Sequence, residues 1–265
     1  MQPILRTLLA LYLAHLLADF VFQSNRLVAQ KTQRKLGAYL RHGLIHYLSA
    51  MAILGFFVPG SIVRPLVYVI VGGLTLLHLA IDLGKIELSP RGFAAGPWGY
   101  LGDQFIHFVT SAVAAWCSTR SIAFGALMEL FETMRRVPNR FLAVPVVYIG
   151  VVFGGGYLIR LLTKPLLPGI HANPTDRHAT GEQLQNAGLY IGWLERFLVL
   201  TALLLQTPAT MGLILTAKSI ARYPEFKSER FAEYFLIGTL LSISLAVSGA
   251  ILLSRIMFGH VIIFR

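Results

Sequence analysis

Eight histidine and aspartate residues of this sequence form four pairs, and the two members of each pair are four positions apart. The pairs are His15/Asp19, His42/His46, His78/Asp82 and Asp103/His107. Four residues of α-helix rise about 6 Å and return to nearly the same face, so each pair presents two side chains to one place. Imidazole nitrogen and carboxylate oxygen are ligands for zinc, manganese and iron. The pattern therefore predicts a metal centre.

All four pairs lie inside strongly apolar segments. The chain has 265 residues, of which 55% are hydrophobic and only 13% are charged, whereas a soluble domain typically has about a quarter charged residues. Apolar runs near the ~20 residues that cross a bilayer recur throughout. We therefore expect an all-α, polytopic membrane protein. Ionisable side chains in such helices are costly unless they face a polar site, and a bound metal would compensate their charge.

Eight membrane-spanning helices are expected. They are placed near residues 3–24, 38–57, 63–86, 98–118, 141–162, 186–206, 208–222 and 231–254. Segment 119–140 is too short and too charged to span readily, and we interpret it as an amphipathic connector. The expected domains are a metal-site bundle at 1–118, the connector at 119–140 and C-terminal membrane helices at 141–265.

The net charge of +11 comes mostly from basic residues in short loops that flank the spans. Their bias places the loops after the odd-numbered spans in the cytoplasm, and it accounts for the charge without nucleic-acid binding. A single cysteine, Cys117, excludes a thiolate cluster, so a metal must use nitrogen and oxygen ligands.

The four pairs are expected at one depth in the membrane. The first pair lies near the exit of span one and the second near the entry of span two, and spans three and four repeat this relation. Antiparallel neighbours would bring all eight side chains within roughly 5–15 Å of the cytoplasmic surface. The pairs are 27 positions apart in the first hairpin and 25 in the second. This repeat predicts a four-helix bundle made of two repeated helical hairpins, with inward ligands.

Eight ligands exceed the four of a tetrahedral zinc. Either two divalent ions are bound, with zinc favoured over manganese or iron, or some of the residues orient the imidazoles of others. The competing interpretation without metal is a hydrogen-bonded network or a proton relay. In a catalytic site, Asp82 or Asp103 could act as general base.

Four further residues are candidates for contact with a substrate. Gln23 and Lys85 could orient a substrate or bind an anionic headgroup, although an interfacial cap and a snorkelling lysine are the simpler interpretations. Arg196 and Lys218 could receive a phosphate or carboxylate at the metal cluster. The simpler interpretation is a set of buried ion pairs among the C-terminal helices, in which Lys218 could pair with Glu233.

The motifs HLLADFVFQ (His15–Gln23), HGLIH, HLAID and DQFIH resemble a bacterial inner-membrane family filed as domain of unknown function 3307. The likeness covers about residues 10–110, and GLYIGWLERF and TAKSIARYPE resemble the second half of its long form. The resemblance implies a multi-pass protein of the bacterial inner membrane. The family has no defined activity. A more remote likeness is to membrane-bound proteins labelled metal-dependent hydrolases.

The sequence thus favours an intramembrane metal-dependent hydrolase whose substrate is a membrane lipid or a lipid-linked ester or phosphoester. One alternative is a divalent metal-ion transporter, whose sites normally lie near the bilayer midplane. Another is a di-iron oxidase of the fatty-acid desaturase kind, although adjacent HH pairs are missing from the chain. The last is a structural or sensory metal-binding protein. The oligomeric state is left open.

Overall fold

The computed structural model describes residues 2–58, 60–88, 96–120, 139–169, 187–227, 229–259 and 261, and the regular structure of these residues is helical. The predicted all-α class is confirmed. The chain divides into two compact units, Met1–Val146 and Val147–Arg265. Most of the predicted connector, residues 121–138, lies outside the described residues, so the division into three domains stays a prediction.

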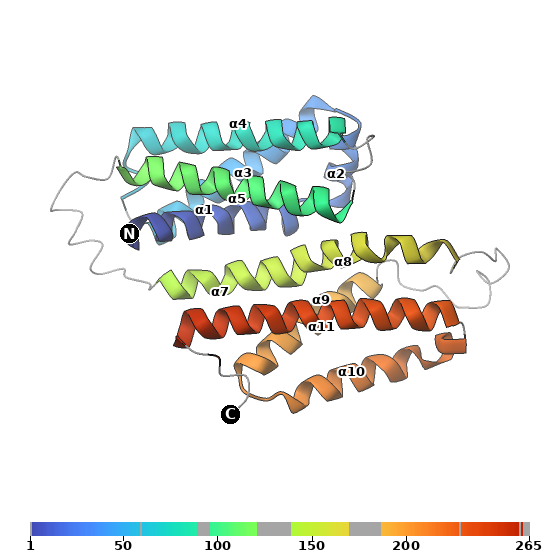
Figure 1. Cartoon of the computed structure of the whole chain (residues 1–265). Helices are drawn as coiled ribbons and strands as arrows, with labels where there is room; N and C mark the ends of the chain where they lie inside the picture. The colour runs from blue at the N-terminus through green and yellow to red at the C-terminus, as the bar shows by residue number, and fades with distance from the viewer. Residues whose placement is uncertain are drawn as a thin grey trace. The chain divides into compact units, whose positions relative to one another are not determined.

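Four long helices build most of the described part of the first unit (Figure 1). They are α1 (Gln2–Phe20), α3 (Leu36–Phe57), α4 (Pro65–Leu88) and α5 (Pro97–Arg120). Helix α1 packs against α3 and α5, and α4 packs against the same two helices. Proline opens both α4 and α5, where its missing N–H costs no helical hydrogen bond. This packing encloses one interior between the four helices.

A short amphipathic helix, α2 (Asn25–Thr32), lies in the connection that was predicted to be a basic loop. Helix α1 ends at Phe20, so the first expected span, 3–24, is too long by four residues at its C-terminal end. Ser24 caps α2 by accepting a hydrogen bond from the backbone N–H of Leu27. At the other end Arg34 adopts a left-handed conformation with φ 57°, as in a Schellman cap. Leu27 and Lys31 are the buried residues of α2.

Large apolar side chains cover much of the outside of the first unit. Leu40, Leu44 and Leu48 of α3 are exposed, and so are Val69 and Leu76 of α4. Extensive apolar exposure is rare in soluble monomers and matches a lipid-facing surface.

Four helical segments of the described residues are long and apolar enough to cross a membrane. They are Pro3–Phe20, Pro65–Leu88, Asn139–Leu166 and Glu229–Phe258. The length and the apolar composition of these helices support the expected membrane character.

The interior of the first unit is apolar at one end and polar at the other. Leu11, Leu54, Val67, Val71 and Ala115 belong to one buried apolar cluster. On each of the four helices the paired histidines and aspartates lie on the side of this cluster that is nearer to α2. The apolar cluster thus closes the interior beyond them.

The described part of the second unit contains a helix that is interrupted by a π-helical turn, followed by three further α-helices. Its elements are the end of α7 (Asn139–Ile149), the π-helical turn Gly150–Gly154, α8 (Gly155–Thr163), α9 (Ala187–Leu204), α10 (Ala209–Arg222) and α11 (Glu229–Phe258). Helix α11 packs against α8 and α9, with Leu200, Leu203 and Ala250 in the shared core. Helix α10 has 14 residues, which is short of the ~20 that cross a bilayer directly.

Candidate metal centre

The four residue pairs of the first unit form two layers. The inner layer consists of one histidine from each long helix: His15, His46, His78 and His107. The outer layer, one helical turn closer to the helix ends near α2, consists of Asp19, His42, Asp82 and Asp103. At 1.5 Å per residue the outer layer lies within about 9 Å of those ends and the inner layer within about 15 Å. All four inner-layer histidines are buried.

The inner-layer imidazoles pack against one another. The ring centroids of His46 and His78 are 3.7 Å apart, and those of His78 and His107 are 4.3 Å apart. His15 completes the layer, with its centroid 4.7 Å from that of His107. Nε2 of His78 is 3.1 Å from Nε2 of His42, and Nδ1 of His78 is 3.1 Å from Nδ1 of His107. Each of these contacts requires a proton on one of its two rings.

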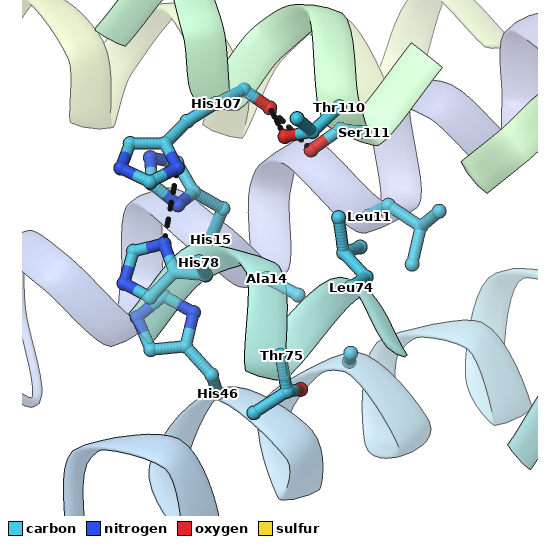
Figure 2. Close-up of a pocket in the computed structure, with 11 residues that line it drawn as sticks. Leu11, Ala14, His15, His46, Leu74, Thr75, His78, His107, Thr110 and Ser111 are labelled. Carbon is cyan, nitrogen blue, oxygen red and sulfur yellow. Dashed lines mark hydrogen bonds between the residues drawn. The ribbon is translucent and has the colours of Figure 1, made fainter. Parts of the chain in front are cut away.

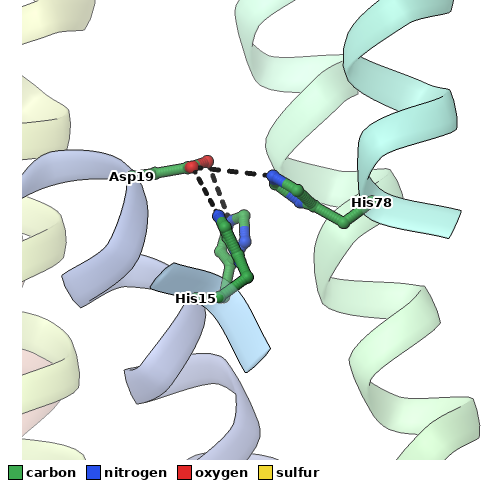
Figure 3. Close-up of side chains that lie close together, drawn as sticks. His15, Asp19 and His78 are labelled. Carbon is green, nitrogen blue, oxygen red and sulfur yellow. Dashed lines mark hydrogen bonds and ion pairs between the residues drawn. The ribbon is translucent and has the colours of Figure 1, made fainter. Parts of the chain in front are cut away.

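Asp19 links the two layers. Its Oδ1 is 2.9 Å from Nε2 of His46 and 3.6 Å from Nε2 of His78, and its Oδ2 is 3.7 Å from Nε2 of His15. Figure 3 shows how Asp19, His15 and His78 converge. Each of these three residues and His46 offers a ligand atom, and the four atoms lie within 4.8 Å of one another. Three imidazoles and one carboxylate are a donor set typical of zinc.

Two further groups of three residues also bring ligand atoms within 4.8 Å of one another. One consists of His42, His78 and Asp82, and the other of Asp82, Asp103 and His107. Only the second of these shares no residue with the four-ligand group. The described part of the protein can therefore hold a metal ion, and all eight predicted ligands belong to groups of this kind.

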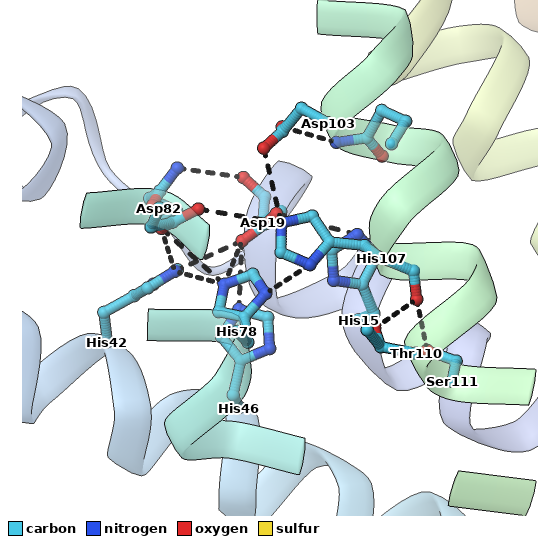
Figure 4. Close-up of polar contacts among 12 residues, drawn as sticks. His15, Asp19, His42, His46, His78, Asp82, Asp103, His107, Thr110 and Ser111 are labelled. Atoms are coloured by element: carbon cyan, nitrogen blue, oxygen red, sulfur yellow. Dashed lines mark hydrogen bonds and ion pairs between the residues drawn. The ribbon is translucent and has the colours of Figure 1, made fainter. Parts of the chain in front are cut away.

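Two lysines neutralise carboxylates of the outer layer, Asp82 and Asp103. Figure 4 shows these two carboxylates beside the histidines. Nζ of Lys31 is 2.6 Å from Oδ2 of Asp82, and Nζ of Lys85 is 2.7 Å from Oδ2 of Asp103. Asp19, in contrast, has imidazoles as the charged partners of its side chain among the described residues. Among the three carboxylates of the outer layer, Asp19 is thus the one that no described lysine or arginine neutralises, and a bound cation would balance its charge.

Several buried polar atoms of the cluster lack a hydrogen-bond partner among the described residues. These atoms are Nε2 of His15, Nδ1 of His42, Nε2 of His107 and Oδ1 of Asp103. The last two lie 3.4 Å from each other, outside hydrogen-bond geometry. Buried polar atoms are nearly always partnered, and those that are not need an explanation such as an ion or a water. The orphaned nitrogen and oxygen atoms fit a divalent cation and its water.

A small cavity borders the inner layer on the side of the apolar cluster (Figure 2). The four inner-layer histidines form one wall, and Leu11, Ala14, Ala50 and Leu74 are part of the apolar remainder. The free space is of the size that one ordered water needs. Thr110 and Ser111, which also line it, donate their hydroxyl hydrogens to the carbonyl oxygen of His107.

Two predicted substrate contacts of the first unit lie beside the cluster. The Gln23 side chain donates to the backbone carbonyl of Asp19 at 3.5 Å, and its buried Oε1 has no hydrogen-bond partner within the described part of the chain. Lys85 forms its ion pair with Asp103, and its side chain is 29% exposed. Their contact with a substrate stays a prediction, as do the catalytic roles of Asp82 and Asp103.

The other two predicted substrate contacts, Arg196 and Lys218, belong to the second unit. Lys218 donates to Oε2 of Glu195 at 2.5 Å and to the Thr239 hydroxyl at 3.0 Å, so the expected pairing with Glu233 is wrong. Arg196 is buried, and its Nε and Nη2 donate to the carbonyl of Val152 in the π-helical turn at 3.1 and 2.7 Å. These contacts hold helices of the second unit together, and a role at the metal cluster stays a prediction.

Lys31 is the residue of the site that the sequence did not reveal. It is 6% exposed, although the sequence places it among the basic residues of a loop. The available signal is the Ser24 cap followed by Leu27 and Lys31 at helical spacing, which brings Lys31 to the buried face of α2.

The fold and the cluster define a helical protein with membrane-type segments and a buried histidine–aspartate centre. The model of the family described as "Protein of unknown function (DUF3307)" matches residues 7–135, so this part of the chain is similar to that family. The match includes both layers as well as Lys31 and Lys85. A search of curated proteins and a search of solved structures found no match. The resemblance to this family is therefore confirmed, whereas no comparison supports the remote likeness to hydrolases.

Proposed function

We propose that the protein is an intramembrane metal-dependent hydrolase that cleaves an ester or phosphoester bond of a lipid or lipid-linked substrate. The observation that supports this most is the four-ligand group, in which three imidazoles and the Asp19 carboxylate lie within 4.8 Å of one another. The orphaned Nε2 of His15 within this group supports the presence of an ion.

We propose one resident divalent ion, zinc by its donor set, rather than the two that the ligand count suggested. A second ion without shared ligands would need Asp82, Asp103 and His107. Lys31 and Lys85 already neutralise both of these carboxylates. The positive charge at this second position therefore comes from lysine.

A divalent ion bound at the four-ligand group would polarise the substrate oxygen and acidify a water molecule. Asp103 is the better placed of the two predicted bases, because Lys85 contacts its Oδ2, and its Oδ1, which lies 3.4 Å from Nε2 of His107, can accept a proton. In hydrolysis the water oxygen bonds to the acyl carbon or phosphorus, and one water proton passes to Asp103. The bond to the leaving oxygen breaks, and that oxygen then takes up a proton.

The proposed membrane arrangement has the eight expected spans, of which the seventh is the short helix α10, with the cluster near the cytoplasmic face of a bacterial inner membrane. In the first unit, α1 with α3 and α4 with α5 correspond to two repeated hairpins, and contacts between these pairs support a four-helix bundle. A site within about 15 Å of the helix ends can reach lipid ester and phosphate groups and can receive water.

Elemental analysis of the purified protein tests the ion, and two histidines of α3 provide a matched pair of variants. His46→Ala removes a member of the four-ligand group and should abolish binding of one zinc per chain. His42→Ala, one turn away on the same helix, should retain the metal. Wild-type protein without metal, or equal metal content in the two variants, would contradict the proposed ion site.

A panel of lipid esters and phosphoesters tests the reaction. The zinc-loaded wild-type protein should release product from at least one member, and His46→Ala should release none. Stoichiometric metal without cleavage of any lipid substrate would refute the proposed activity and leave a structural or sensory role.

A divalent-metal transporter is the second candidate, and the overlap of the three ligand groups favours it. His78 and Asp82 are each shared by two groups, so an ion could pass from one group to the next. The closed apolar core around Leu11, Leu54 and Val71 argues against a path beyond the inner layer. Zinc uptake by proteoliposomes would reverse this ranking.

A further inference from the structure

We infer that the Lys31–Asp82 and Lys85–Asp103 pairs form a binding site for a phosphate group, so that the substrate of the proposed hydrolase is an anionic phosphoester. This inference rests on the proposed function, and it selects phosphoester over carboxylic ester.

The two ion pairs lie next to each other. Asp82, Asp103 and His107 bring ligand atoms within 4.8 Å of one another, and each carboxylate carries one lysine. The two ammonium groups come from different elements, Lys31 from α2 and Lys85 from the last turn of α4. Two lysines from separate helices are thus held at one side of the cluster.

Both lysines keep hydrogen-bond donors for a ligand. An ammonium group has three N–H donors, and the hydrogen bond that each lysine makes in the described structure goes to its aspartate. The carboxylates hold the ammonium groups in place before a ligand arrives, which lowers the cost of binding an anion. Oδ1 of Asp103 lies 3.4 Å from Nε2 of His107, so the carboxylate that positions Lys85 is itself held between a lysine and a histidine.

The charge of the cluster favours an anionic ligand. With neutral imidazoles, the three carboxylates face two ammonium groups, and one negative charge remains. The proposed divalent ion converts this into one positive charge inside a membrane-type bundle, where net charge is costly. A phosphodiester group brings one negative charge and neutralises the site, whereas a carboxylic ester leaves the positive charge in place.

Lys85 is the most exposed of the four residues in the two ion pairs, so a ligand can reach it from the surface. Its side chain is 29% exposed, whereas those of Lys31, Asp82 and Asp103 are between 8% and 12% exposed. A phosphate group that approaches from the helix ends would therefore meet Lys85 first. Phosphate of a lipid headgroup and phosphate of a soluble ester share this chemistry.

Calorimetric titration of the full-length protein in maltoside detergent with inorganic phosphate tests the site. Lys85→Met should weaken phosphate binding about ten- to hundredfold, the effect of losing one charge-assisted hydrogen bond, and it should leave the zinc content unchanged. Lys85→Arg should restore most of the affinity. Lys35→Met is the control, because Lys35 is an exposed basic residue at the start of α3, and phosphate affinity should not change.

Four outcomes would overturn the inference: no phosphate binding by zinc-loaded wild-type protein, equal affinity in Lys85→Met, an equal loss in Lys35→Met, or loss of zinc in Lys85→Met. Metal content is measured on the same samples, so failure of phosphate binding is distinguished from failure of the proposed ion site. The titration is also run on metal-free protein, so that the lysine dependence is decided whether or not zinc is found.

The source of the phosphate is decided with two organic probes. Tighter binding of dihexanoyl phosphatidic acid than of glycerol 3-phosphate supports a lipid-linked substrate. Equal binding of the two probes would overturn the lipid assignment and point to a soluble phosphoester.

Discussion

The Lys31→Met variant provides a direct test of the outer layer. Lys31 and Asp82 form an ion pair of 2.6 Å between side chains that are 8% and 12% exposed. Removing one partner of a buried pair leaves an uncompensated charge and costs about 3–5 kcal/mol. Methionine keeps most of the volume of the lysine stem, so lost packing adds little. In a unit of this size each kcal/mol lowers the melting temperature by about 2–4 °C, so we expect a decrease on the order of 10 °C.

Thermal unfolding of the metal-free protein in detergent, followed by circular dichroism, measures this effect. Adding Asp82→Asn to Lys31→Met removes the stranded charge and should restore more than half of the lost melting temperature. Lys35→Met, at an exposed position, should change the melting temperature by only about 1–2 °C. A Lys31→Met protein as stable as the wild type, or a double variant less stable than the single one, would refute the assignment of Lys31 as the counter-ion of Asp82.

Three further predictions concern the ion and the backbone. Asp19→Asn should weaken zinc binding at least about tenfold in calorimetric titration, because it removes the anionic ligand of the four-ligand group; unchanged affinity would exclude Asp19 as a ligand. Gly156→Ala should destabilise the second unit by about 1–3 kcal/mol, because the new Cβ would lie 2.5 Å from Nη2 of Arg196. The control Gly72→Ala, whose Cβ meets no atom within 4 Å, should leave the melting temperature equal or slightly raised. Gln206→Gly should stabilise the protein by up to about 1 kcal/mol, because Gln206 has φ 59° at the end of α9; a lower melting temperature would show that its side chain makes a larger contribution.

The sequence predicted the features that depend on local periodicity. The expected spans at 38–57 and 63–86 match α3 and α4 within two residues at each end. The convergence of the pairs followed from helix geometry alone, because residues four apart share a face and short loops join antiparallel helices. The sequence alone therefore places His15 and His78 in one cluster.

The sequence could not predict features that depend on the path of the chain between spans. Residues 25–32 are polar and short, so they have the composition of a loop, and only the packing of α2 against α3 brings Lys31 to Asp82. The predicted pairing of Lys218 with Glu233 is wrong for a similar reason. Its position at the end of the seventh expected span is compatible with either Glu233 or Glu195, and the packing of α10 against α9 selects Glu195.

The order of residue types within the four pairs reflects the direction of each helix. Helices α1 and α4 run toward the end near α2, and in both of them the histidine precedes the aspartate. Helix α5 runs the opposite way, and there Asp103 precedes His107. The reversal of the motif therefore keeps every carboxylate in the outer layer and an imidazole of every helix in the inner layer.

This sorting of side chains has a physical reason. A neutral imidazole is less costly to bury than a carboxylate, and the inner layer borders the apolar cluster of the first unit. The carboxylates lie where Lys31 and Lys85 can reach them from α2 and from the end of α4. The residues that would hold an ion thus have imidazoles toward the apolar cluster, and the lysine-paired carboxylates lie toward the helix ends near α2. Motif order, helix direction and charge thus all favour the end of the bundle near α2 as the side from which the proposed substrate would approach the centre.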